Sequence, residues 1–138
     1  MEIIKLPSAL LVLLLLASCA STGSNRLSTE YSASDDLANK RFVLQFHNNG
    51  RRLLCLSSAT WPNVVGNIPL TSADISVSIR QKVFPLDTFM EDCHDCTFTV
   101  KPHSLLVGYL NYSAFKIPDE LAGEYKELHL LPMAVSCD

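Results

Sequence analysis

Hydrophobic and polar positions divide the chain into three segments with different patterns. Residues 10–16 form a continuous apolar run, whereas residues 20–39 are small and polar with few side chains to bury. From residue 40 onward, apolar side chains recur at every second position in several short runs. Such alternation places one face of a β-strand in a core and the other in solvent. The sequence therefore predicts a β-domain over residues 40–138.

Seven strands are expected in this domain, with turn-forming residues between most of them. They cover residues 42–46, 51–57, 74–80, 97–100, 105–110, 127–130 and 134–137. Asn48-Asn49-Gly50 predicts a hairpin between the first two strands, because Asn and Gly tolerate positive φ. The apolar run 105–110 predicts a central strand, and residues 118–123 fit a single helical turn.

No segment shows a sustained apolar spacing of 3.6 residues, so the short strands indicate an all-β fold. A small antiparallel two-sheet sandwich of about seven strands accounts for the pattern. In strand number and length the domain resembles the immunoglobulin-like class, a likeness that implies no function. The apolar members of the alternating runs should face the core. They are Phe42, Leu44, Phe46, Ile75, Val77, Ile79, Phe98, Val100, Leu128 and Leu130.

The apolar run near the N-terminus follows a start that carries Lys5 and precedes small residues. A positive start, an apolar stretch of roughly 7–15 residues and small residues before a cut site are typical of a secretory signal peptide. A transmembrane helix needs about 20 apolar residues, so this run is too short to span a bilayer. The segment Leu16-Ala17-Ser18-Cys19 ends the run and resembles the lipobox of bacterial lipoproteins.

This resemblance implies that residues 1–18 are a signal peptide and that Cys19 receives the lipid, with acyl chains such as palmitate. Residues 19–39 would then be a lipidated N-terminus and flexible tether that joins the β-domain to a membrane of the cell envelope. Ala20 follows the cysteine in place of Asp, which in a Gram-negative source implies export to the outer membrane. An ordinary secretory cleavage after Ala20 also fits the small-residue rule and stays open.

Five cysteines are an odd number, which calls for an explanation in an exported protein. Removal or modification of Cys19 leaves an even set of four, as expected in an oxidising compartment. Four cysteines allow three pairings. Cys55 and Cys137 lie far apart in strand-like segments, and a bridge between them leaves Cys93 and Cys96 as a tight local bridge. We favour this disulfide pairing, and the two crossed pairings stay open.

The segment Cys93-His94-Asp95-Cys96 has the spacing of a redox motif or of half a zinc site. A redox cysteine is normally activated at a helix N-terminus, but strand-like residues follow this motif. Asp92 and Asp95 also disfavour a thiolate because their charge has the same sign. A structural disulfide is therefore the favoured interpretation, and a redox or metal-binding module centred on Cys93-x-x-Cys96 is the alternative function.

Trp61 is the candidate partner-binding residue, because it lies in a loop and exposed loop aromatics often bind partners. The alternative, which we favour, is that the only tryptophan of a small domain closes the end of the core. Either arrangement is compatible with a loop placed at one end of a sandwich.

Neither the charge of the chain nor its histidines indicate a specific chemical function. The chain has 11 basic and 14 acidic residues, and no basic stripe extends beyond Arg51-Arg52, so nucleic-acid binding is unsupported. No catalytic motif such as Gly-x-Ser-x-Gly or His-Glu-x-x-His occurs. The sequence therefore predicts no enzyme, no metal and no cofactor. It favours a non-enzymatic, lipid-anchored binding or scaffolding module of unknown specific activity, whose partners are a membrane, through its lipid, and an envelope protein.

Overall fold

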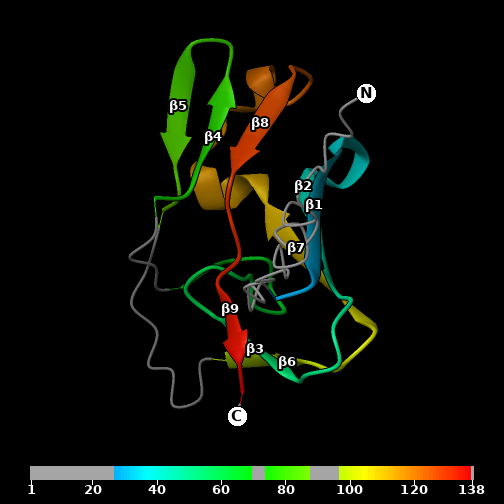
Figure 1. Ribbon diagram of the computed structural model, residues 1–138. Helices are drawn as coiled ribbons and strands as arrows, with labels where there is room; N and C mark the ends of the chain where they lie inside the picture. The colour runs from blue at the N-terminus through cyan, green and yellow to red at the C-terminus, as the bar shows by residue number, and fades with distance from the viewer. Residues whose placement is uncertain (1–26, 70–73, 88–96, 138) are drawn as a thin grey trace, which may run out of the picture.

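The computed structural model describes residues 27–69, 74–87 and 97–137 (Figure 1). In this part of the chain the regular elements are antiparallel β-strands and short 3-10 helices, so the predicted all-β class is confirmed. The strands are β1 Thr29–Asp36, β2 Arg41–Asn48, β3 Leu54–Ser57, β4 Ser76–Ile79, β5 Lys82–Pro85, β6 Thr97–Val100, β7 Ser104–Asn111, β8 Lys126–His129 and β9 Ala134–Ser136. The 3-10 helices are η1 Leu37–Asn39, η2 Tyr112–Phe115 and η3 Asp119–Leu121.

The strands form three sheets with the orders β1-β2-β7, β6-β3-β9 and β5-β4-β8. In Figure 1 the long strands of the first sheet stand at one side, with β5-β4-β8 toward the top and β6-β3-β9 toward the bottom. Buried side chains from all three sheets meet in one hydrophobic core. The fold is therefore sandwich-like, with nine described strands in place of about seven and three sheets in place of two.

The predicted core positions all contribute to this core. Phe98 and Leu128 are partly buried and pack against it, whereas the other predicted positions are buried. Leu44, Leu56 and Val77 have no exposed surface. Period-two alternation therefore identified the inward faces of β2, β4 and β6 correctly, because one face of each strand is buried.

The predicted boundary at residue 40 is wrong, because a strand precedes it. All eight residues of β1 pair with β2, from Thr29 opposite Asn48 to Asp36 opposite Arg41. Most β1 side chains are exposed, so the strand shows no apolar alternation in the sequence. The predicted tether 19–39 thus includes a strand of the domain, and the described fold begins about ten residues earlier than expected. β5 was missed for the same reason, because most of its side chains are exposed.

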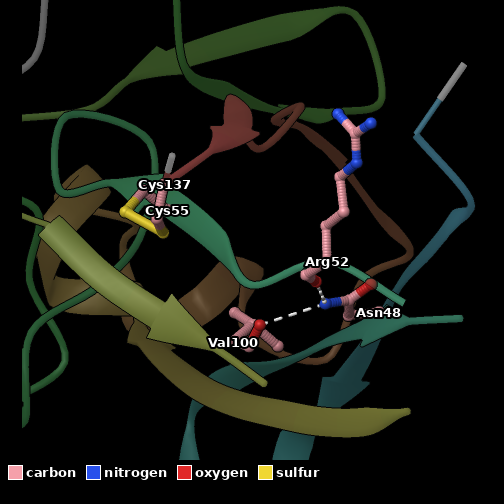
Figure 2. Close-up of a disulfide and its surroundings, with 5 residues drawn as sticks. All are labelled: Asn48, Arg52, Cys55, Val100 and Cys137. Atoms are coloured by element: carbon pink, nitrogen blue, oxygen red, sulfur yellow. Dashed lines mark hydrogen bonds between the residues drawn. A yellow bond between two sulfur atoms is a disulfide. The ribbon is translucent and has the colours of Figure 1, made fainter. Parts of the chain in front are cut away.

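The hairpin predicted at Asn48-Asn49-Gly50 is also wrong, because β2 and β3 belong to different sheets. Asn48 is 1% exposed and ties these sheets together. Its side-chain Nδ2 donates hydrogen bonds to the carbonyl oxygens of Arg52 at 2.8 Å and Val100 at 3.0 Å (Figure 2). Its Oδ1 accepts a hydrogen bond from the Gly50 backbone N–H at 3.0 Å. Asn48, which the sequence placed in a turn, is thus a buried polar residue that joins the two sheets.

Two smaller predictions have opposite outcomes. Helix η3 provides the helical turn expected within residues 118–123. The apolar strand predicted to be central is instead β7, which among the described strands pairs with β2 alone and so lies at an edge of its sheet. Its apolar side chains are exposed on one face, as at Val107, and buried on the other, as at Leu110.

Candidate functional site

The structure joins Cys55 and Cys137 in a disulfide, with an S–S distance of 2.13 Å and a Cα–Cα distance of 5.2 Å (Figure 2). This is the pairing favoured from the sequence, and it connects β3 to the residue that follows β9. The other three cysteines, Cys19, Cys93 and Cys96, lie outside the described residues. Lipidation at Cys19 and the chemistry of Cys93-x-x-Cys96 therefore stay predictions.

Trp61 is 2% exposed, so the candidate partner-binding residue is part of the core. Its ring meets the ring of Phe46 edge to face, with centroids 6.3 Å apart. Gly108 in β7 makes room for it, because a Cβ at this position would lie 3.0 Å from the indole ring and 2.9 Å from Pro62 Cγ. Trp61 thus supports β7 from the inner side of the sheet, in agreement with the favoured interpretation of a core tryptophan and not with a partner-binding one.

The outer face of β7 carries a row of exposed apolar side chains. Leu105 is 53% exposed, Val107 40% and Tyr109 42%. They alternate with residues that point to the core, as expected for a strand. The strand Ser104–Asn111 contains no charged residue and no proline. Edge strands usually carry such residues, because an uncharged open edge pairs readily with other chains. We define Leu105, Val107 and Tyr109 as the β7 row.

The backbone of the β7 row faces the open edge. The Asn111 N–H donates to the Gly66 carbonyl at 3.0 Å, so the backbone groups of Asn111 point away from β2. Backbone direction alternates along an antiparallel strand. Positions 105, 107 and 109 therefore also direct their N–H and C=O groups away from β2. Because β7 is the last strand in its sheet, these groups face an edge to which no described strand is added.

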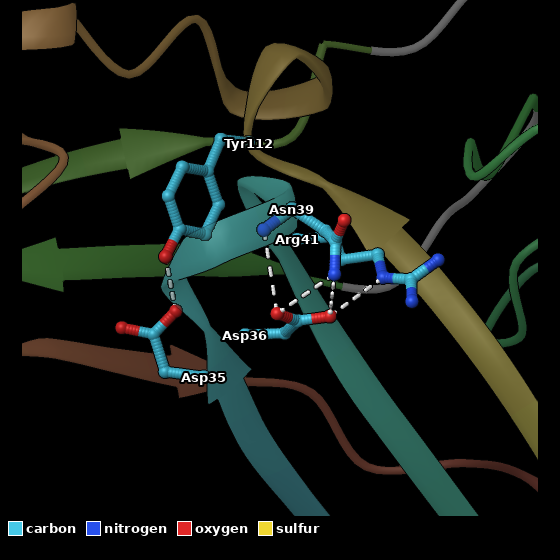
Figure 3. Close-up of polar contacts among 5 residues, drawn as sticks. All are labelled: Asp35, Asp36, Asn39, Arg41 and Tyr112. Atoms are coloured by element: carbon cyan, nitrogen blue, oxygen red, sulfur yellow. Dashed lines mark hydrogen bonds and ion pairs between the residues drawn. The ribbon is translucent and has the colours of Figure 1, made fainter.

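Tyr109, at one end of the β7 row, is held by Arg41. The guanidinium carbon lies 4.0 Å from the centroid of the Tyr109 ring, a cation–π distance. Arg41 Nε donates to Asp36 at 2.9 Å, and the Asn39 side-chain amide also donates to this carboxylate at 2.9 Å (Figure 3). The hydrogen bonds from Asn39 and Arg41 hold the pKa of Asp36 below its usual value. The tyrosine ring is therefore positioned by a fixed polar network.

A second polar cluster is buried where β1, η2 and β8 meet. The Lys126 side chain is 1% exposed, and its Nζ lies 3.1 Å from Asp35 Oδ2. It also donates to the carbonyl oxygens of Ala122 at 2.5 Å and Glu124 at 2.9 Å. The ammonium lies 4.6 Å from the centroid of the Tyr112 ring. Tyr112 donates a hydrogen bond to Asp35 (Figure 3), and burial together with this bond raises the pKa of the phenol.

This cluster was not predicted, because Asp35 and Lys126 are 91 residues apart in sequence. A pocket of about 210 Å³ lies beside it and includes Ser34 and Tyr125 in its lining. An ammonium group has three donors, and Asp35 with the two carbonyl groups engages all of them. The cluster therefore acts as an internal fastening between β1 and β8, with no donor of Lys126 left for a ligand.

Other candidate chemistry is sparse in the part of the chain that the structure describes. No group of three or more His, Cys, Asp and Glu residues there is arranged to hold a metal ion. His129 Nε2 lies 2.8 Å from Ser78 Oγ on the neighbouring strand, a pair joining β8 to β4. Within residues 27–69, 74–87 and 97–137, no helix has the length and apolar character needed to cross a membrane.

Comparison with known proteins gives no match, whether with family models, curated proteins or solved structures. The β7 row is therefore the candidate functional site on its own physical merits. It combines exposed apolar side chains, an open backbone edge and a rigid inner support.

Proposed function

We propose that the protein is a lipid-anchored component of the bacterial cell envelope whose β-domain binds an extended segment of another envelope protein. The Leu16-Ala17-Ser18-Cys19 segment supports the anchor. The observation that supports binding is β7, an uncharged eight-residue edge strand with three exposed apolar side chains. Binding is non-enzymatic and adds a strand to the β1-β2-β7 sheet.

Strand addition explains both properties of the β7 row. A peptide added to a sheet edge gains affinity from main-chain hydrogen bonds and specificity from alternate side chains. The N–H and C=O groups at positions 105, 107 and 109 supply the main-chain part. On the outer face, Leu105, Val107 and Tyr109 would contact every second side chain of the incoming strand. The partner is therefore a segment with apolar residues at alternating positions.

The anchor is tested first, by intact-mass measurement of the protein from its native envelope. We expect a mature chain that begins at Cys19 and carries the mass of a diacylglyceryl group and an acyl chain. Cys19→Ala should leave an unprocessed precursor or shift the cleavage. An unmodified N-terminus at Ser21 would overturn the anchor, because it indicates ordinary secretory cleavage.

Strand addition is tested by Val107→Pro. This change removes an N–H that faces the open edge but leaves an apolar side chain in the β7 row. Proline is tolerated on an edge strand where its nitrogen faces solvent, so pairing with β2 should persist. The matched control is Ala33→Pro on β1. Because Asn49 donates to the Ser28 carbonyl, the alternation directs the Ala33 backbone to the opposite open edge of the same sheet.

The readout is cross-linking from a photoreactive side chain at position 109 in native envelopes. We expect a discrete adduct whose cross-linked peptide maps to one extended, alternating segment. Val107→Pro should remove most of this adduct, whereas Ala33→Pro should preserve it. An adduct that survives Val107→Pro would exclude strand addition, and the absence of any adduct would overturn the binding function.

A further inference from the structure

One end of the β1-β2-β7 sheet collects cations that form no ion pair with the described residues. Most basic residues of the described chain form ion pairs, namely Lys40, Arg41, Arg80, Lys116 and Lys126. Among the described residues, Arg51, Arg52, Lys82 and Lys101 form none. Lys82 lies at the β4–β5 turn. The other three lie in the two turns that flank Asn48.

Asn48 holds these turns together with the start of β1. Its Nδ2 donates to the Arg52 carbonyl at 2.8 Å and also contacts the Lys101 carbonyl at 3.2 Å. The backbone N–H of Asn49 donates to the Ser28 carbonyl at 2.8 Å. Figure 2 shows the Arg52 side chain extending away from the Asn48 amide. The three cations therefore lie at the end of the sheet where the described chain begins.

Apolar side chains accompany the cations at this end. Leu27 is 37% exposed, Leu53 39% and Leu105 53%. Leu27 precedes β1, Leu53 follows Arg52, and Leu105 follows the turn that contains Lys101. We define the basic end as Arg51, Arg52 and Lys101 together with these three leucines. Within the start of β1 and the two turns, the acidic residue that the structure describes is Glu30.

The acidic residues concentrate at the opposite end of the sheet. Asp35 and Asp36 end β1, and Asp119 and Glu120 begin η3. Asp35, Asp36 and Asp119 are paired with Lys126, Arg41 and Lys40, so the two ends differ chiefly in the cations of the basic end, which form no ion pair among the described residues. A surface with unpaired cations and exposed leucines is suited to anionic headgroups above an apolar layer.

The chain length before β1 fixes which end is near the lipid. Nine residues lead from Cys19 to Ser28, and a fully extended chain covers at most about 3.3–3.6 Å per residue. Ser28 therefore lies within about 30 Å of a lipidated cysteine. Because Ser28 is bonded to Asn49, the basic end is the part of the domain closest to the anchor.

We propose that the basic end docks on anionic phospholipid headgroups of the membrane that holds the acyl chains. This inference rests on the proposed anchor, which brings the domain to the surface. Each Arg or Lys near an anionic surface strengthens attachment about fivefold, and salt screens the effect. The three cations together therefore favour the docked orientation roughly a hundredfold. Leu27 and Leu53 enter the headgroup layer, Leu105 stays with the β7 row, and the acidic end points away from the membrane.

The test uses the mature, full-length protein in vesicles of phosphatidylcholine alone or of phosphatidylcholine with phosphatidylglycerol. Flotation reports membrane attachment, and acylation of lysine amines followed by mass spectrometry reports contact. Lys101 is the reporter for the basic end. Lys116 is the internal reference, because it follows η2 beyond the far end of β7 and its side chain is 74% exposed. On phosphatidylglycerol vesicles, the Lys101 to Lys116 reactivity ratio should fall at least about fivefold.

A charge-reversal variant identifies the residues responsible. Arg51→Glu with Arg52→Glu should abolish protection of Lys101 and keep the reporter itself intact. Gln81→Glu with Lys82→Glu is the control, because it changes the net charge by −3, close to the −4 of the arginine pair, at the exposed β4–β5 turn. This control should keep the protection. High salt should reduce the protection in the unmodified protein.

The outcomes separate the docking surface from the anchor. Flotation with both vesicle types and protection only on phosphatidylglycerol supports both proposals. Flotation with both types but equal Lys101 reactivity overturns the docking surface and leaves the anchor. Flotation only with phosphatidylglycerol vesicles overturns the anchor and supports the surface. A protein that floats with neither overturns both.

Discussion

The two ends of the β1-β2-β7 sheet are fastened by different chemistry. At the basic end, a neutral amide on Asn48 donates to backbone carbonyl groups, and the Cys55–Cys137 disulfide closes the neighbouring sheet. At the acidic end, the buried Lys126 ammonium pairs with Asp35 and lies against Tyr112. One end is fixed by neutral groups and a covalent bond, and the other by buried charge.

The difference determines which charges are available to partners. Burying a neutral amide with satisfied hydrogen bonds needs no counterion, whereas a buried ammonium requires one. The acidic end therefore uses Lys126 within the fold, and Arg41 is partly buried against Asp36. The basic end leaves Arg51 and Arg52 outside any described ion pair. Internal fastening by neutral groups thus keeps cations free for an external surface.

The largest expected effect is loss of the disulfide at the basic end. Cys55→Ala with Cys137→Ala should destabilise the domain by about 4 kcal/mol, because the bridge closes a long loop; the two cysteines are 82 residues apart. Thermal unfolding measures the loss. Cys93→Ala with Cys96→Ala is the control and should cost much less, because a loop that short restricts the unfolded chain little. Equal losses would contradict this account.

At the acidic end, Lys126→Met should cost about 3 kcal/mol, the lower part of the range for removing one partner of a buried ion pair. The change leaves the Asp35 carboxylate and the carbonyl groups of Ala122 and Glu124 without their common donor. Lys82→Met is the control at an exposed, unpaired lysine and should change stability by less than about 0.5 kcal/mol. Urea midpoints at constant m-value would measure both. Similar midpoints would indicate that the pair contributes nothing.

Asn48→Ala should cost about 2 kcal/mol, because it leaves buried carbonyl groups unsatisfied. Asn49→Ala changes an exposed side chain next to it and should be nearly neutral. Asn48→Ala should also raise the reactivity of Lys101 on anionic vesicles, because the two turns lose their common tie. Stability and lipid contact that are both unchanged would show that Asn48 does not organise the basic end.

The smallest effect at neutral pH is expected for Tyr112→Phe, about 1.5 kcal/mol from one lost hydrogen bond to a carboxylate. Alkaline pH should reduce the contribution of the buried phenols. Burial raises the pKa of Tyr31 to about 12 and also raises the pKa of Tyr112. An unfolded tyrosine ionises near pH 10, so the unfolded state loses its proton first.

The free energy of unfolding should decrease as the pH rises above the pKa of an unfolded tyrosine. The tyrosine contribution is complete below about pH 10 and declines as the pH rises toward 12 and beyond. Unfolding midpoints between pH 9 and 12 should therefore decrease, and Tyr112→Phe should make that decrease shallower. A Tyr112→Phe slope as steep as that of the unchanged protein would contradict the assignment.

The strands with one buried face could be predicted from the sequence, and the exposed edges could not. Alternation found β2, β4 and β6 because their inward residues are apolar and their outward ones polar. β1 was not predicted, because most of its side chains are exposed at the edge of the sheet and show no apolar alternation. β7 was placed in the centre because its outward residues are as apolar as its inward ones. That same excess of apolar residues is what identifies the candidate binding row.

The polar junctions could not be predicted, because they join distant segments. Nothing near Lys126 in the sequence indicates that Asp35 will neutralise it. The sequence around Asn48 predicts a turn and does not indicate that this side chain is buried. The disulfide was easier, because Cys55 and Cys137 both lay in predicted strands. Local patterns thus specify strands, whereas polar contacts depend on the tertiary arrangement.

The order of the cysteines along the chain has a consequence for the timing of folding. During synthesis Cys55 emerges first, then Cys93 and Cys96, and Cys137 after them. A fast oxidant therefore meets a wrong pair before the right one exists, and thiol–disulfide exchange must correct it. Acid-trapped peptides from early oxidation should show Cys55 joined to Cys93 or Cys96. The native bridge therefore forms only after Cys137 has followed the three earlier cysteines, and it joins two segments that were made at very different times.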